Sequence, residues 1–415
     1  MDSSFARRRT RTALVAAALV FAVAPQRSAL AQDAAAPRDP DHDIVNIRIV
    51  DVVPETKDVR ARKNLTYPTR DGKSLRFDLY LPPRPESRSV PLVVFLNGVG
   101  ALDIPDWGQY ASWCPRVAAS GLAAVTHAAR RESALADTED LLKHLRAAAR
   151  DLGIDSERIG AFACSANVHE TWPLFADPEK SGLSCVALYY GNAGGDAEPP
   201  AMPFLLVRAG RDGAQINAGI ERIVQRSLTA DVDFEFIDYR DGHHGFDGVD
   251  DTPRSRQIIR RTIEFWRERL LPAETNDPGR PAERSLARDA LAFWFGRDMA
   301  GAVPRYRELV EKRPDDGVAW FRLGMALVTT GERLGAIEPF EKAAALGVER
   351  GTSLFNLACL RATKGERDAA MTSLERAYEA GFPDRGALDQ DPDLASLRSD
   401  PRFAALKAKV SRGGQ

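Results

Sequence analysis

The chain is organised around residues 158–168, which read Arg158-Ile159-Gly160-Ala161-Phe162-Ala163-Cys164-Ser165-Ala166-Asn167-Val168. An apolar run leads into a serine that is flanked by small residues. This is the layout of a nucleophile elbow, in which a serine occupies a strained turn between a strand and a helix. Ala163 and Asn167 stand where the usual G-x-S-x-G motif has glycines. We expect the turn to form, because alanine is small and asparagine tolerates left-handed backbone angles.

Eight apolar runs of strand length surround this stretch and are separated by turn residues or helical segments. They cover residues 64–67, 75–81, 92–96, 122–126, 159–163, 185–190, 204–207 and 234–239. From residue 92 onward the runs are continuously apolar, as in buried parallel strands, whereas 75–81 alternates like an antiparallel strand near an edge. Helical periodicity covers residues 137–152 and 254–270. The pattern predicts an α/β fold with a doubly wound, mostly parallel, eight-stranded sheet.

Two further chemical groups follow the seventh and eighth runs. The seventh run ends in Ala209-Gly210-Arg211-Asp212, and the eighth is followed by Asp241-Gly242-His243-His244-Gly245-Phe246. The carboxyl ends of parallel strands lie at the same edge of a sheet, so Ser165, Asp212 and a histidine should meet there. The order Ser, Asp, His is that of a hydrolase triad.

Residues 63–270, about half of the chain, resemble α/β-hydrolases of the dienelactone hydrolase and carboxylesterase kind. The motifs that carry this resemblance are Arg-Ile-Gly-x-x-x-x-Ser-Ala at 158–166, Ala-Gly-x-Asp at 209–212 and His-Gly-Phe at 244–246. The resemblance implies that Ser165 is the nucleophile, His244 the general base and then acid, and Asp212 the carboxylate that orients the imidazole.

The same resemblance implies an oxyanion hole. One donor would be the backbone N–H of Ala166, and the other would come from the loop after the third strand, around Asn97 and Gly98. Family members usually carry His-Gly where this chain has Asn97-Gly98. Backbone donors alone are required, so the substitution is compatible with the function.

The sequence leaves three alternatives open. Cys164 could replace Ser165 as nucleophile, although a turn centred on Cys164 would place the bulky Phe162 where a small residue is needed. His243 competes with His244, which alone matches the His-Gly-Phe motif. The aromatic residues after the oxyanion loop could line an acyl pocket or be packed in the core; they are Trp107, Tyr110 and Trp113.

The amino-terminal region reads as a signal peptide over residues 1–31, with an arginine-rich start, a short apolar run and Ala29-Leu30-Ala31 before the cut. The apolar run is too short for a permanent membrane anchor. We therefore expect an exported protein, periplasmic or secreted. Residues 32–60 read as a tether, with an accessory strand near 44–50.

A different period begins after a linker predicted at residues 272–283. Residues 34 apart repeat in type across three copies, as in Ala290, Gly324 and Ala358. This spacing indicates tetratricopeptide-like (TPR-like) helical repeats over residues 284–411, which follow the hydrolase-like segment 61–271. Such repeats resemble partner-binding modules, so a protein partner is expected there.

Composition narrows the function further. A net charge of -2 with 44% hydrophobic residues gives no indication of a nucleic-acid partner. The glycine-rich stretches lack the Lys-Ser/Thr of a phosphate loop, and the four cysteines are far apart, so we expect neither cofactor nor metal. The sequence therefore predicts a serine hydrolase acting on a small-molecule acyl substrate. The alternative is a catalytically silent α/β-hydrolase scaffold that serves as an interaction protein.

Overall fold

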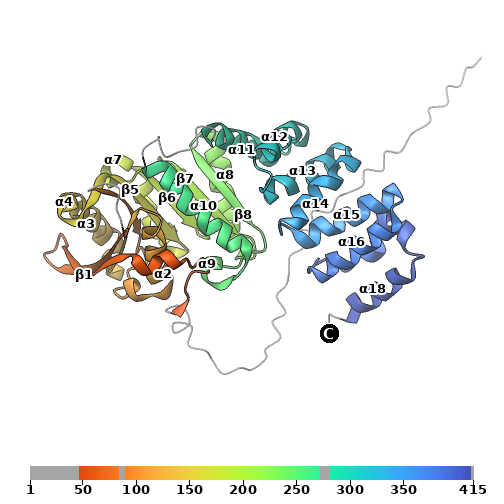
Figure 1. The fold of residues 1–415 in the computed structure, drawn as a ribbon. Coiled ribbons are helices and arrows are strands. Elements are labelled where there is room, and N and C mark those ends of the chain that lie inside the picture. Colours follow the sequence, from red (N-terminus) through yellow and green to blue (C-terminus); the bar gives the residue numbers. More distant parts are fainter. Residues whose placement is uncertain (1–45, 84–88, 272–279, 413–415) are drawn as a thin grey trace, which may run out of the picture. The chain divides into compact units, whose positions relative to one another are not determined.

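The computed structural model describes residues 46–83, 89–271 and 280–412 (Figure 1). The predicted signal peptide, the start of the tether and most of the predicted linker lie outside these ranges. In the described part, the chain forms an α/β region followed by a region built only of helices. None of the described helices is both long enough and apolar enough to span a bilayer.

Within the described ranges, eight strands form a single sheet in the order β1-β2-β4-β3-β5-β6-β7-β8. Only β1 and β2 run antiparallel to their neighbours, and all the other pairs are parallel. This confirms the predicted doubly wound, mostly parallel, eight-stranded sheet. The strand bounds are β1 (Arg60–Pro68), β2 (Ser74–Leu81), β3 (Val90–Phe95), β4 (Ala123–His127), β5 (Ile154–Cys164), β6 (Cys185–Tyr189), β7 (Phe204–Ala209) and β8 (Phe234–Tyr239).

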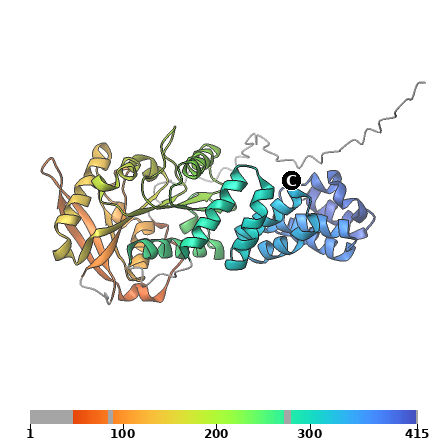
Figure 2. The same cartoon turned by 90° about the horizontal axis from the view of Figure 1, so that it is seen from above.

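Helices cover both faces of the sheet (Figure 2). The longer ones in this region are α2 (Gly108–Ala118), α3 (Ala134–Ala147), α8 (Ala214–Thr229) and α10 (Pro253–Leu270). Short helical segments connect them: η1 (Pro54–Asp58), η2 (Ile104–Asp106), η3 (Arg131–Ser133), α4 (Ala149–Leu152), α5 (Ala166–Thr171), α6 (Pro173–Ala176), α7 (Pro178–Ser181) and α9 (Phe246–Val249).

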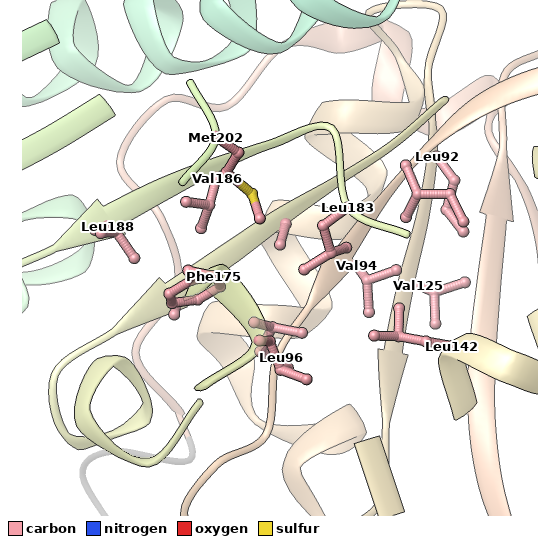
Figure 3. Packing of buried hydrophobic residues seen from close by; sticks show 14 of the residues in the cluster. Leu92, Val94, Leu96, Val125, Leu142, Phe175, Leu183, Val186, Leu188 and Met202 are labelled. Carbon is pink, nitrogen blue, oxygen red and sulfur yellow. The ribbon is translucent and has the colours of Figure 1, made fainter. Parts of the chain in front are cut away.

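Alternation along the strands produces two hydrophobic cores. Leu92 and Val94 of β3 point to the face covered by α3 and α8, where they join Leu142 (Figure 3). Val93 and Phe95 point to the opposite face, which α2 and α10 cover. Successive side chains of a strand point to opposite faces, so a central strand that is apolar throughout must be buried on both. Strand β5, which leads to Ser165, is likewise buried on both faces over residues 159–164.

Several sequence expectations need correction. Strand β5 begins five residues earlier than predicted, and the helix predicted at 137–152 is divided between α3 and α4. Residues 47–50 form no strand. The amide of Val50 instead donates to the carbonyl of Asp247, and Asp51 pairs with both Arg116 and Arg260. A buried carboxylate with two guanidinium partners holds this segment without a sheet ladder.

The carboxyl-terminal region consists of helices along its whole described length. They are α11 (Arg280–Phe295), α12 (Met299–Lys312), α13 (Gly317–Thr330), η5 (Arg333–Ala336), α14 (Ile337–Ala345), α15 (Arg350–Lys364), α16 (Arg367–Glu379), α17 (Ala387–Gln390), η6 (Pro392–Leu397) and α18 (Pro401–Arg412). Residues 280–283, predicted as linker, thus belong to α11. A Cβ on Gly324 would lie 2.9 Å from the Phe340 ring, so this small residue allows α13 and α14 to approach closely.

Candidate active site

The turn from β5 into α5 carries Ser165, and its backbone is strained. Ser165 has φ 54° and ψ -133°, a region that residues with a Cβ rarely occupy. Asn167, in contrast, is not among the described residues with positive φ and belongs to α5. The turn forms as expected, but the tolerance of asparagine for left-handed backbone angles is not used at this position. The strain falls on the serine itself, which projects its hydroxyl at the end of the strand, as an elbow requires.

The loops after β7 and β8 approach each other closely. The amide of Gly210 donates to the carbonyl of Tyr239, and the amide of Arg211 donates to that of Gly242. A Cβ on Gly210 would lie 2.2 Å from the carbonyl oxygen of Arg240, so a side chain at this position would force the two loops apart. This close contact brings Asp212 and His244 to the same edge.

Ser165, His244 and Asp212 form one continuous hydrogen-bonded chain. The Ser165 Oγ lies 2.8 Å from His244 Nε2, and His244 Nδ1 lies 2.7 Å from Asp212 Oδ2. The second carboxylate oxygen of Asp212 accepts the amide of Gly213 at 2.7 Å. With its proton on Nδ1, the imidazole donates to Asp212 and leaves Nε2 free to accept the serine proton. The structure brings together all three predicted residues.

The side chains of Cys164 and His243, the alternatives to Ser165 and His244, contact other residues. Cys164 is buried, its Sγ lies 3.7 Å from the Tyr110 hydroxyl, and burial raises the pKa of its thiol to about 12. A protonated thiol is a weak nucleophile, so the site favours Ser165. The imidazole of His243 binds Asp250 instead of Ser165, with its Nδ1 2.8 Å from Asp250 Oδ1.

The loop after β3 is held by the side chain of Asn97. We call residues 97–101, for which the sequence predicts a donor to an oxyanion, the oxyanion loop. The fully buried Asn97 accepts the amides of Gly100 and Ala101 on Oδ1, each at 3.1 Å, and its Nδ2 donates to the carbonyls of Ala101 and His127. Asparagine therefore has a structural role at this position.

The aromatic residues after the oxyanion loop are mainly core residues. Trp113 is fully buried and Tyr110 almost so, and both rings contact Phe95. Trp107 is half-buried beside Tyr110. Packing, rather than an acyl pocket, accounts for Tyr110 and Trp113.

Tyr190 and Asp247 belong to the site but were missed in the sequence. The ring of Tyr190 lies 4.8 Å from that of His244, and its hydroxyl donates to Asp247 Oδ1 at 2.7 Å. Asp247 is completely buried and also accepts from Gln109 and Trp113. Burial raises the pKa of Tyr190 well above its usual value, which keeps the hydroxyl protonated as a donor. The position of Asp247 three residues after His244 was the one available signal.

Among the residues that the structure describes, one group of side chains outside this site has the composition of a metal site. The potential ligand atoms of Cys359, Asp391 and Asp393 lie within 4.8 Å of one another. Existing contacts already account for these atoms, because Cys359 donates to Asp391 and Asp393 pairs with Arg333. Burial also raises the pKa of the Cys359 thiol well above its usual value, which disfavours the thiolate that a metal requires.

Comparison with known proteins finds no matching protein-family model and no matching curated protein. Solved structures do match. Esterase LipW from Mycobacterium marinum shares 18% identity over 52% of this chain and 83% of its own, with a TM-score of 0.44. A bacterial heroin esterase shares 18% identity over 54% of this chain and 87% of its own, with a TM-score of 0.44. The metagenomic carboxylesterase EstE1 shares 17% identity over 56% of this chain and 93% of its own, with a TM-score of 0.43. At such low identities and TM-scores, the activity must be inferred from the side chains of this chain.

Proposed function

We propose that the protein is a serine hydrolase that cleaves an ester or a related acyl bond. The observation that carries the proposal is the hydrogen-bonded chain from the Ser165 hydroxyl through His244 to Asp212. A free serine hydroxyl is a poor nucleophile, and an adjacent imidazole that is oriented by a carboxylate activates it.

In the first half of the reaction, Ser165 Oγ forms a bond to the acyl carbon while its proton passes to His244 Nε2. The developing oxyanion would accept hydrogen bonds from the amides of Ala166 and Gly98. The bond to the leaving oxygen then breaks, and His244 returns its proton to that oxygen. Asp212 stabilises the imidazolium throughout, without taking its proton.

In the second half, water attacks the acyl-serine. His244 accepts the water proton and then donates it to Ser165 Oγ as the carboxylic acid leaves. No step needs a cofactor, and the substrate is a small molecule with an acyl group.

A labelling experiment tests the proposal. The full mature chain is incubated with a fluorophosphonate probe and with p-nitrophenyl esters of several chain lengths, beside Ser165→Ala and Cys164→Ala. We expect labelling and turnover in the unmutated protein and in Cys164→Ala, with both lost in Ser165→Ala. Absence of both in the unmutated protein would favour the silent scaffold, and loss only in Cys164→Ala would make the cysteine the nucleophile.

We also propose that the protein is exported and that its helical region binds a protein partner. Amino-terminal sequencing of the processed protein tests export, with Gln32 expected as the first residue.

Partner binding is tested by comparing cross-linked complexes of the full chain and of a chain that ends at Arg297. The truncation retains α11 because its Leu291 is buried in the core of the sheet.

A further inference from the structure

Asn167 connects the elbow to the oxyanion loop through its side chain. It is the second residue after Ser165 and is 5% exposed. Its Oδ1 accepts the amide of Val99 at 3.0 Å, and its Nδ2 donates to the Tyr110 hydroxyl at 3.0 Å. Both ends of the amide group are thus used, which fixes its orientation.

The contact from Asn167 is the third side-chain hydrogen bond to an amide of the oxyanion loop. Asn97 already accepts the amides of Gly100 and Ala101, and Asn167 accepts that of Val99. Among the described hydrogen bonds the amides of Asn97 and Gly98 have no acceptor, and we take that of Gly98 as the donor to an oxyanion. Its position depends on α5 as well, because a Cβ on Gly98 would lie 2.7 Å from the Cβ of Glu170.

Glycine, the usual residue at this position of the elbow motif, could not make either contact. The amide of Val99 and the hydroxyl of Tyr110 would each lose a partner in a mostly buried region, at a cost that favours rearrangement. A donor stabilises an oxyanion only if it is already aimed at the place where charge develops.

We propose that Asn167 is a positioning residue that fastens the oxyanion loop to the nucleophile elbow and so holds the Gly98 amide in place. The inference rests on the proposed serine hydrolase function. On this proposal, the asparagine that replaces the usual glycine contributes to the site. Its side chain connects α5, which contains Ala166, to the loop that contains Gly98, and these two residues are the proposed oxyanion donors.

The test uses the full mature chain and the variant Asn167→Ala, with Asn167→Gly as a second variant. We expect kcat for p-nitrophenyl acetate to fall on the order of ten- to a hundredfold with KM within about twofold, since the loss concerns the transition state. Affinity for phenylboronic acid, which forms a tetrahedral adduct with serine, should fall by the same factor as kcat/KM.

Thr171→Val is the matched control. The Thr171 hydroxyl donates to the carbonyl of Asn167 within α5 at 2.6 Å. The variant removes this hydrogen bond from the same helix and keeps the Cγ2 methyl group that lies near Gly98 of the loop. Its kcat should stay within about twofold of the unmutated value. An equal loss of kcat in Thr171→Val and Asn167→Ala would overturn the proposal, because general weakening of α5 would then explain both.

Hydrogen exchange supplies a readout that does not depend on activity. The peptide covering the oxyanion loop should exchange faster in both Asn167 variants, while peptides from β3 and β5 keep their rates. Unchanged exchange in the loop would refute the fastening role even if the enzyme is active. An unmutated protein without esterase activity, but with faster loop exchange in the variants, would instead refute the proposed function alone.

Discussion

At the scale of single residues, Asp212 controls which nitrogen of His244 carries a proton. Replacing it by asparagine keeps the shape but allows an amide N–H to face Nδ1, which favours the wrong tautomer. We expect Asp212→Asn to lower kcat by roughly 10⁴ with little change in KM. Steady-state kinetics with p-nitrophenyl acetate measures this.

Asp250→Asn is the control for that substitution. Asp250 makes the same kind of contact, at 2.8 Å, to the neighbouring His243. Because His243 does not contact Ser165 among the described hydrogen bonds, kcat should change by no more than about threefold. Equal losses in the two variants would mean that both carboxylates act through loop structure and that the tautomer argument is wrong.

His127 gives a pH dependence to the stability of the fold. Its imidazole is fully buried, and burial lowers its pKa to about 4. The unfolded chain, with a pKa near 6.5, binds the proton more tightly, so stability is complete above about pH 6.5 and falls as the pH drops towards 4. We expect the protein to lose roughly 2 to 3 kcal/mol through this group between pH 7 and 4.5.

Urea unfolding at several pH values checks this contribution. His127→Gln lacks the titrating group, so its free energy of unfolding should fall less steeply over the same window than that of the unmutated protein. Carboxylates titrate in both proteins and cancel in the comparison. Parallel slopes for the two proteins would show that His127 contributes nothing to the pH dependence.

The residues of the candidate triad could be predicted because each follows a strand with a recognisable local motif. The residues that support them could not. Tyr190 meets His244 and Asp247 only after the segments that follow β6 and β8 have folded together. Asn167 was interpreted through its backbone, whereas its side chain makes the contacts. Side-chain direction depends on tertiary structure, which a local pattern does not specify.

At the scale of elements, the contact between the oxyanion loop and α5 is tight enough to test by adding one methyl group. A Cβ on Gly98 would meet Glu170 Cβ at 2.7 Å, Thr171 Cγ2 at 3.0 Å and the carbonyl of Asn167 at 3.1 Å. We expect Gly98→Ala to destabilise the fold by about 1 to 3 kcal/mol and to lower kcat, because the loop must move away from the helix. Thermal unfolding and steady-state kinetics measure the two effects.

Gly335→Ala in η5 serves as the control, since the nearest atom to its added Cβ is Leu327 Cδ1 at 3.9 Å. Neither Tm nor kcat should change appreciably in this variant. If Gly98→Ala behaved like Gly335→Ala, the loop would have to tolerate displacement, and close contact with α5 would not determine its position.

Strands and helices with a continuous apolar pattern could be predicted from the sequence, but the residues at which they begin and end could not. The central strands were found because Val, Leu and Phe are continuous in them, whereas the first five residues of β5 are mostly polar and gave no such signal. Residues 47–50 looked like a strand, but buried hydrogen bonds and ion pairs hold that segment instead. Composition cannot distinguish these two ways of fixing an extended backbone.

At the scale of the whole molecule, α11 has two buried faces. Ala290 is completely buried in the helical core, together with Tyr306 of α12. The next residue, Leu291, is buried in the core of the sheet, and the ring of Phe295 lies 6.3 Å from that of Phe236. The repeat of 34 residues could reveal only the first face, because the second has no counterpart in later helices.

Leu291→Ala should therefore weaken the α/β region although the residue lies in the helical one. Truncation of a buried leucine removes apolar contacts and leaves a cavity, so we expect a loss of about 2 to 4 kcal/mol. The urea concentration at which half of the esterase activity is lost should therefore be lower.

Leu309→Ala, at a residue buried within the helical core, is the control. Circular dichroism should show its helices unfolding at a lower urea concentration, while the midpoint of inactivation is unchanged. If only Leu309→Ala shifted the inactivation midpoint, the active site would depend on the helical core, and α11 would not be the element that stabilises the sheet.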